Sequence, residues 1–140
     1  MRIIITLLVL LTSSLNAQTM IPLSKYLDEN SFEKNEMFYI FTRCSAVGYK
    51  LMDLNKDRPE LNETGKTIYQ TYFYFGTEIR KTIMPDDDDD QQMEITGMTV
   101  GSMVDAYTEV SNDHYIKTGL YFSDWMLEDL KVCSDLLGQL

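Results

Sequence analysis

The chain has 140 residues, carries a formal net charge of −10 at pH 7, and contains two cysteines and one histidine. This length is enough for one domain with a hydrophobic core. The negative charge repels nucleic acids and anionic lipid headgroups, so the composition argues against a nucleic-acid partner.

The first residues have the layout of a secretory signal peptide. Arg2 precedes an apolar run, Ile3 to Leu11, which gives way to small and polar residues ending at Ala17. The run is shorter than the about 20 residues that a membrane-spanning helix needs. We expect cleavage after Ala17 and export of residues 18–140, as one helical domain without a transmembrane segment, to the periplasm or the extracellular space. An uncleaved N-terminal anchor is the alternative.

Cys44 and Cys133 are expected to form a disulfide, because an even pair of cysteines in an exported chain is typically oxidised. The alternative is a reactive thiolate, which needs a neighbouring base or positive charge. Zinc binding is disfavoured, since one histidine and two bonded cysteines do not supply three or four ligands.

Residues 30–57 have the spacing of an amphipathic helix. Its apolar stripe recurs at steps of three and four and comprises Met37, Ile40, Phe41, Cys44, Gly48 and Leu51. Asn30 is the expected N-cap, with Glu33 in the capping-box position, and Pro59 prevents continuation. A short helix near Pro22 would precede it.

Residues 61–83 predict a second long helix, although residues 67–75 are rich in β-favouring side chains and a strand is the alternative there. Tyr69, Phe73 and Tyr74 lie off the main apolar stripe. They either cover a second buried face or form an exposed aromatic patch for a protein partner.

Five consecutive aspartates, Asp86 to Asp90, follow Pro85. Asp86, Asp88 and Asp90 are weak metal-ligand candidates. However, an EF-hand loop starting at Asp86 would need glycine and glutamate where Gln91 and Gly97 stand. A helix start is preferred, with Asp86 or Asp87 as the cap, because carboxylates favour helix N-termini. A mobile loop is the alternative.

Two further helices complete the expected fold. The stripe of the first comprises Met93, Gly97, Val100, Val104, Tyr107 and Ser111. Gly97 and Gly101 suggest close packing on a neighbouring helix, and Gly119 is the expected stop. Ser123 is the expected cap of the last helix, whose stripe comprises Met126, Leu130, Cys133 and Leu137. The sequence therefore predicts a single-domain, all-α bundle of about four main helices, with a disulfide joining the first and the last.

Residue patterns typical of catalysis are weak. His114 lies in no nucleophile motif, and no phosphate-binding or dinucleotide fingerprint occurs, so no cofactor is expected and an enzyme is the less favoured class. Carboxylates are too plentiful for one pair to stand out; the mid-helix candidates are Asp53, Glu78, Asp105 and Glu109.

The size, export, helicity and cysteine pair are similar in outline to those of small periplasmic acid-stress chaperones and of secreted helical immunity proteins. This is a fold-level resemblance, and no functional residue is carried over from it. The favoured function is a non-enzymatic protein-binding or envelope-associated factor with an unknown protein partner. An acid-stress chaperone is the alternative, and an enzyme with a carboxylate-based site is the second alternative.

Overall fold

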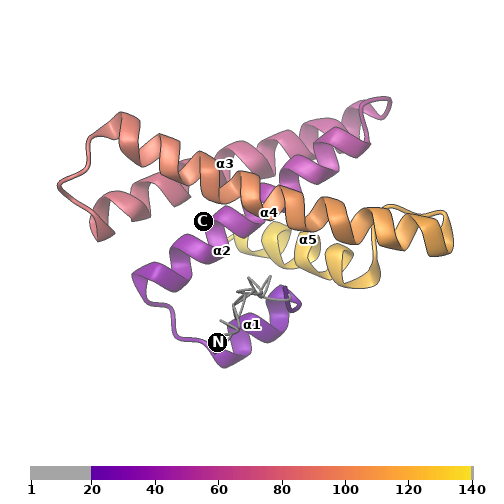
Figure 1. Ribbon diagram of the computed structural model, residues 1–140, viewed down its shortest axis with the longest axis horizontal. Coiled ribbons are helices and arrows are strands. Elements are labelled where there is room, and N and C mark those ends of the chain that lie inside the picture. Colours follow the sequence, from indigo (N-terminus) through magenta and orange to yellow (C-terminus); the bar gives the residue numbers. More distant parts are fainter. Residues whose placement is uncertain (1–19, 140) are drawn as a thin grey trace, which may run out of the picture.

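The computed structural model describes residues 20–139, so the expected signal peptide lies outside the described residues. This part of the chain folds into helices and contains no strand (Figure 1). The helices are α1 (Leu23–Glu29), α2 (Lys34–Leu54), α3 (Pro59–Ile83), α4 (Asp89–Thr118) and α5 (Asp124–Leu137). The all-α bundle is confirmed, with short α1 added to four main helices. None of the helices within residues 20–139 has the length and apolar character needed to span a bilayer.

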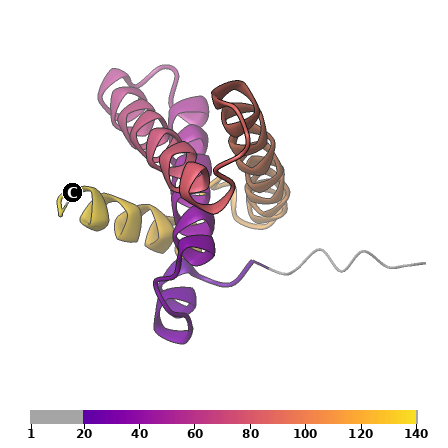
Figure 2. The same ribbon diagram turned by 90° about the vertical axis from the view of Figure 1, so that its left-hand side faces the viewer.

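Helix α2 is the central element of the bundle. Helices α3, α4 and α5 all pack against it (Figure 2). Helix α1 lies against α5. The buried side chains of α2 therefore face several neighbours at once, and Thr42 through Gly48 are all buried. A narrow apolar stripe would not have predicted such a wide buried surface.

The closest contact between helices is the crossing of α2 and α3 at Gly48 and Gly65. A Cβ atom on Gly65 would lie 2.4 Å from the backbone nitrogen of Met52, and one on Gly48 would lie 2.6 Å from that of Tyr69. Both positions therefore exclude any side chain.

The prediction of close packing at Gly97 and Gly101 is wrong. A Cβ on Gly101 would meet nothing within 4 Å, and one on Gly97 would make only an ordinary 3.9 Å contact with Phe73.

Helix α3 continues without interruption through residues 67–75, which decides between helix and strand there. Ile68, Tyr72 and Gly76 recur at steps of four and are all buried. Burial of this helical face outweighs the β-propensity of the individual residues. Pro59 at the first turn, together with Arg80 and Lys81 in the last turn, suits the two ends of the helix.

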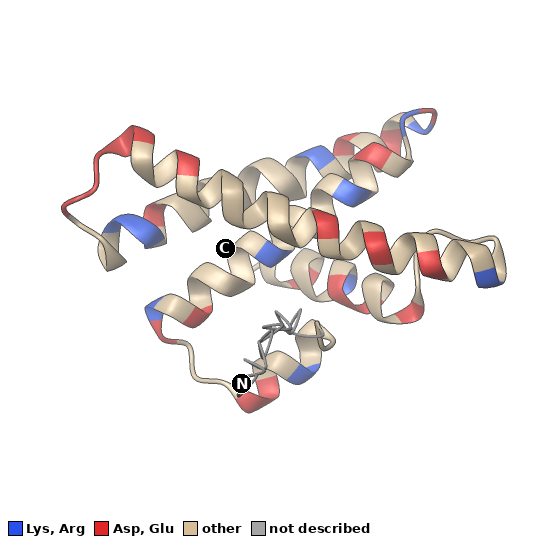
Figure 3. Ribbon diagram, in the orientation of Figure 1, with Lys and Arg blue, Asp and Glu red and all other residues tan. Residues whose placement is uncertain are grey.

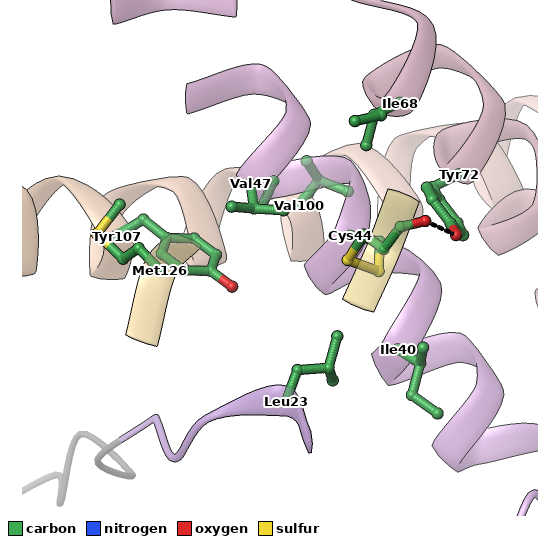
Figure 4. Close-up of a cluster of buried hydrophobic side chains, with 11 residues drawn as sticks. Leu23, Ile40, Cys44, Val47, Ile68, Tyr72, Val100, Tyr107 and Met126 are labelled. Carbon is green, nitrogen blue, oxygen red and sulfur yellow. Dashed lines mark hydrogen bonds between the residues drawn. A yellow bond between two sulfur atoms is a disulfide. The ribbon is translucent and has the colours of Figure 1, made fainter. Parts of the chain in front are cut away.

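The predicted disulfide is present and lies inside the core. Cys44 and Cys133 are bonded with their Cα atoms 5.5 Å apart, and both are fully buried (Figure 4). Beside the bond, the hydroxyl of Tyr72 donates a hydrogen bond to the carbonyl of Cys133. The disulfide thus joins α2 to α5, and the hydrogen bond from Tyr72 joins α3 to the same place.

The ends of the helices correct several predicted caps. Asn30 donates to the carbonyl of Tyr26 and ends α1, so the N-cap of α2 is Glu33 instead. Gly119 adopts the predicted left-handed conformation with φ of 76°. Ser123 is the N-cap of α5 as predicted, although its side chain makes no capping hydrogen bond.

Helix α4 buries a face shifted by one residue from the predicted stripe at its start. Gln92 and Thr96 are buried, whereas Met93 is exposed. The hydroxyl of Thr96 donates to the backbone carbonyl of Gln92. The side-chain amide nitrogen of Gln92 donates to the backbone carbonyl of Met84. The Thr96 hydroxyl and the Gln92 side-chain nitrogen are thus paired, whereas the Gln92 side-chain oxygen is buried without a hydrogen-bond partner.

Candidate functional site

The centre of the molecule holds a buried ion pair between Arg43 of α2 and Asp129 of α5. The Arg43 Nη2 atom lies 2.5 Å from Asp129 Oδ2, Nε lies 3.0 Å from the same oxygen, and both side chains are 0% exposed. Tyr107 of α4 donates its hydroxyl to Oδ2, and the backbone N–H of Leu23 in α1 donates to Oδ1 at 2.6 Å. One carboxylate therefore joins four of the helices.

Arg43 makes further contacts that complete its surroundings. Its Nη1 donates to the hydroxyl of Tyr39 at 3.0 Å, and its guanidinium carbon lies 5.8 Å from the centroid of the Trp125 ring. Burial alone lowers the pKa of Arg43, but interaction with Tyr107 and Asp129 more than reverses this, so the net pKa is raised. Burial also raises the pKa of Tyr107 well above its ordinary value.

This buried network is a structural frame. Arg43 and Asp129 have no exposed surface, so they do not meet a substrate from solvent. Asp129 was absent from the predicted carboxylate candidates. Its position three residues after Met126 and four before Cys133 places it on the predicted buried stripe, and this spacing could have identified it.

The surface feature most suited to binding is a hollow between α3 and α4, which we call the aromatic groove. It has a volume of about 340 Å³. Its lining comprises Tyr69, Gln70, Phe73, Tyr74, Thr77, Glu78, Lys81, Asp89 and Met93. The three residues predicted as a contact surface, Tyr69, Phe73 and Tyr74, are thus brought together on its wall.

The three aromatics differ in burial. Tyr69 and Phe73 are partly buried, pack against the core, and have ring centroids 6.0 Å apart. Tyr74 is 60% exposed, and Met93 from α4 is 47% exposed. The groove therefore has a partly buried aromatic floor and an accessible apolar edge.

The polar end of the groove is formed by Lys81 and two carboxylates. Lys81 Nζ lies 2.9 Å from Glu78 and 3.0 Å from Asp89. Hydrogen bonds to Glu78 and Asp89 raise the pKa of Lys81. Since one ammonium faces two carboxylates, this end of the groove keeps an excess negative charge.

Helix α4 starts within the run of five aspartates, as predicted. Asp88 is the N-cap and forms a capping box with Gln91, so the predicted cap at Asp86 or Asp87 is wrong. Asp87 forms an ion pair instead, with its Oδ2 atom 2.8 Å from Nη2 of Arg80. The backbone N–H of Asp87 donates to the carbonyl of Met84 and closes a turn before the helix.

No metal site is formed within residues 20–139 by three or more histidine, cysteine, aspartate or glutamate side chains. The weak candidates Asp86, Asp88 and Asp90 are all exposed. Figure 3 shows acidic residues in this connection and along α4.

The other predicted carboxylates lie on three different helices, Asp53 on α2, Glu78 on α3, and Asp105 and Glu109 on α4. Asp53 pairs with Lys56 at 2.7 Å and Glu78 pairs with Lys81, both within one helix or at its end. Asp105 and Glu109 are exposed on α4. His114 lies near the end of α4 and is partly exposed.

A second exposed apolar surface lies where α4 ends and α5 begins, and we call it the apolar tip. It comprises Tyr115, Ile116, Leu120, Tyr121 and Leu127. The rings of Tyr115 and Tyr121 are stacked with centroids 4.3 Å apart, and Ile116 is 80% exposed.

Comparison with protein-family models, with curated proteins and with solved structures finds no match to this chain.

Proposed function

We propose that this chain is an exported, non-enzymatic protein-binding factor that takes its partner in the aromatic groove. The observation that carries the proposal is the pairing of a partly buried aromatic floor, Tyr69 and Phe73, with the exposed edge formed by Tyr74 and Met93. Aromatic and methionine side chains are enriched where proteins bind one another.

Export is supported by the signal-peptide layout of residues 1–17 and by the Cys44–Cys133 disulfide. Disulfides persist in oxidising compartments and are rare where thiols are kept reduced. The groove lies on the two longest helices, α3 and α4, and its residues Tyr69 and Phe73 pack against the hydrophobic core. A pre-organised surface loses less conformational entropy on binding than a mobile one.

The test is site-specific photo-crosslinking with the full-length protein in cells that export it. A photoreactive amino acid replaces Tyr74 at the groove and, as a control on the same helix, Leu61, which is exposed but does not line the groove. We expect a protein adduct of defined mass from position 74 and none from position 61.

A third variant carries the photoreactive group at Ile116 in the apolar tip. If that variant captures a protein and the Tyr74 variant does not, the binding surface is the tip and the groove assignment is wrong. If none of the three variants forms a protein adduct, although each is exported, the protein-binding role is contradicted.

A further inference from the structure

We propose that the partner presents a cationic-apolar segment, in which an apolar side chain enters the aromatic groove and a neighbouring lysine or arginine pairs with Glu78 and Asp89. This inference rests on the proposed function and names the chemistry of the partner. It is carried by the arrangement of the groove, whose apolar edge and acidic end lie side by side on α3 and α4.

The apolar part of the groove suits one or two anchoring side chains. The whole groove has a volume of about 340 Å³, at the lower end of the range of roughly 300–1,000 Å³ that ligand pockets occupy. Met93 supplies a flexible thioether, and Tyr74 supplies a ring that is already exposed. Flexible methionine side chains adapt to the shape of an incoming residue.

The acidic end supplies charge complementarity. Lys81 contacts Glu78 and Asp89 at once, and their side chains remain 43% and 81% exposed. An incoming cation can therefore reach carboxylate oxygens that Lys81 does not cover. The bidentate geometry of arginine matches a carboxylate especially well.

The charge of the whole molecule favours the same partner. Helix α4 carries six acidic residues against Lys117 alone among lysine and arginine: Asp89, Asp90, Glu94, Asp105, Glu109 and Asp113. With a net charge of −10, the chain attracts a basic segment over a distance of several ångströms. The same charge opposes pairing with a second copy of the chain or with an anionic lipid surface.

The experiment is a nuclear magnetic resonance titration of the isotope-labelled, oxidised chain with four short peptides. The peptides combine either a central leucine and phenylalanine or two alanines with either lysine or glutamate flanks. We expect the peptide with the apolar centre and lysine flanks to shift the amide signals of the groove residues, and to bind more tightly than the other three. Its affinity should fall as sodium chloride screens the charges.

Matched charge variants test the acidic end. Glu78→Gln combined with Asp89→Asn removes the two groove carboxylates. Glu63→Gln combined with Asp105→Asn removes the same charge from the same two helices outside the groove, and Glu63 also has a lysine partner three residues away. We expect the first pair of changes to weaken binding of the lysine-flanked peptide about two- to tenfold. The control pair should change its affinity by less than about twofold.

The outcomes separate this inference from the proposed function. If peptides with an apolar centre shift the groove signals equally with lysine or glutamate flanks, the groove binds protein but the cationic requirement is wrong. If lysine-flanked peptides bind equally with the alanine centre, the acidic surface binds cations without an apolar anchor and the inference is also wrong. If none of the four shifts the groove signals at millimolar concentration, both the inference and the groove assignment are contradicted. Concentration-dependent shifts without peptide would instead identify a second copy as the occupant.

Discussion

At the scale of single residues, Asp129 has the widest influence on the fold. Its carboxylate accepts hydrogen bonds from Arg43 of α2, Tyr107 of α4 and the backbone of Leu23 in α1. A buried ion pair gives little net stability, because removing two charges from water costs about as much as their attraction returns. We infer that the pair serves mainly to fix how the helices meet, since the three donors approach from different elements.

Replacing Asp129 by asparagine leaves the Arg43 charge buried without its counterion. We expect Asp129→Asn to lower the free energy of unfolding by about 3–5 kcal/mol, measured by urea denaturation followed by circular dichroism. Asp135→Asn is the matched control, because Asp135 pairs with Lys131 on the exposed face of the same helix. The control should change the stability by less than about 1 kcal/mol.

The combined change Arg43→Met with Asp129→Leu distinguishes the effect of an unpaired buried charge from the effect of altered packing. It removes both charges and should be less destabilising than Asp129→Asn alone. If Asp129→Asn were as mild as the Asp135 control, the pair would not be buried in the way described.

At the scale of the elements, the backbones of α2 and α3 are in direct contact where the two helices cross. Gly48 and Gly65 allow the two backbones to meet, whereas Gly97 and Gly101 lie where α4 makes no such contact. Glycine lowers the stability of a helix interior by about 1 kcal/mol relative to alanine. This cost is offset by close packing at the first two positions and is not offset at Gly101.

Two alanine substitutions should therefore act in opposite directions. Gly65→Ala places a Cβ within 2.4 Å of the α2 backbone and should destabilise the protein by about 1–3 kcal/mol. Gly101→Ala meets nothing within 4 Å and should stabilise it by about 0.5–1 kcal/mol. Thermal unfolding of the two variants beside the parent chain measures both effects, and a stabilised Gly65→Ala would refute the close crossing.

At the scale of the whole molecule, Tyr72 links α3 to the disulfide that closes α2 onto α5. Its hydroxyl donates to the carbonyl of Cys133, and burial raises the pKa of Tyr72 to about 12. The folded state thus disfavours the phenolate, whereas the unfolded chain ionises this tyrosine near its ordinary pKa of 10.0. The stabilising contribution is complete below pH 10 and is lost as the pH rises towards 12.

We therefore expect the free energy of unfolding to fall steeply above about pH 10. Tyr107 contributes to the same fall, because burial also raises its pKa. Tyr72→Phe should make the decline shallower, although it loses about 1 kcal/mol at neutral pH with the hydrogen bond. Urea denaturation at a series of pH values measures the slope, and an unchanged slope in Tyr72→Phe would contradict the assignment.

The sequence predicted the long helices, the disulfide and the Gly119 stop because each depends on local spacing or on a pair of rare residues. It did not predict Asp129 as a buried group, since a carboxylate enters a core only when partners such as Arg43 await it on other helices. The buried face at the start of α4 was predicted one residue out of place for a similar reason. Gln92 and Thr96 are polar, and their burial depends on nearby carbonyl acceptors.

The candidate site was predicted in part. Tyr69, Phe73 and Tyr74 were identified because they lie off the apolar stripe of α3. Met93 and Asp89 were not included with them, because the groove requires α3 and α4 to lie side by side. Cap positions within the aspartate run depended on Arg80, which engages Asp87 and leaves Asp88 to cap the helix.

The position of the disulfide has a consequence for how the chain reaches its oxidised state. Cys44 lies in the second helix and Cys133 in the last, and the sequence contains no other cysteine. Only one intramolecular pairing exists, so oxidation cannot trap a shuffled isomer and no isomerase is needed to correct one. A chain that emerges N-terminus first would carry Cys44 as a lone thiol until residue 133 has emerged. During that interval the competing product is a mixed disulfide or a covalent dimer through Cys44.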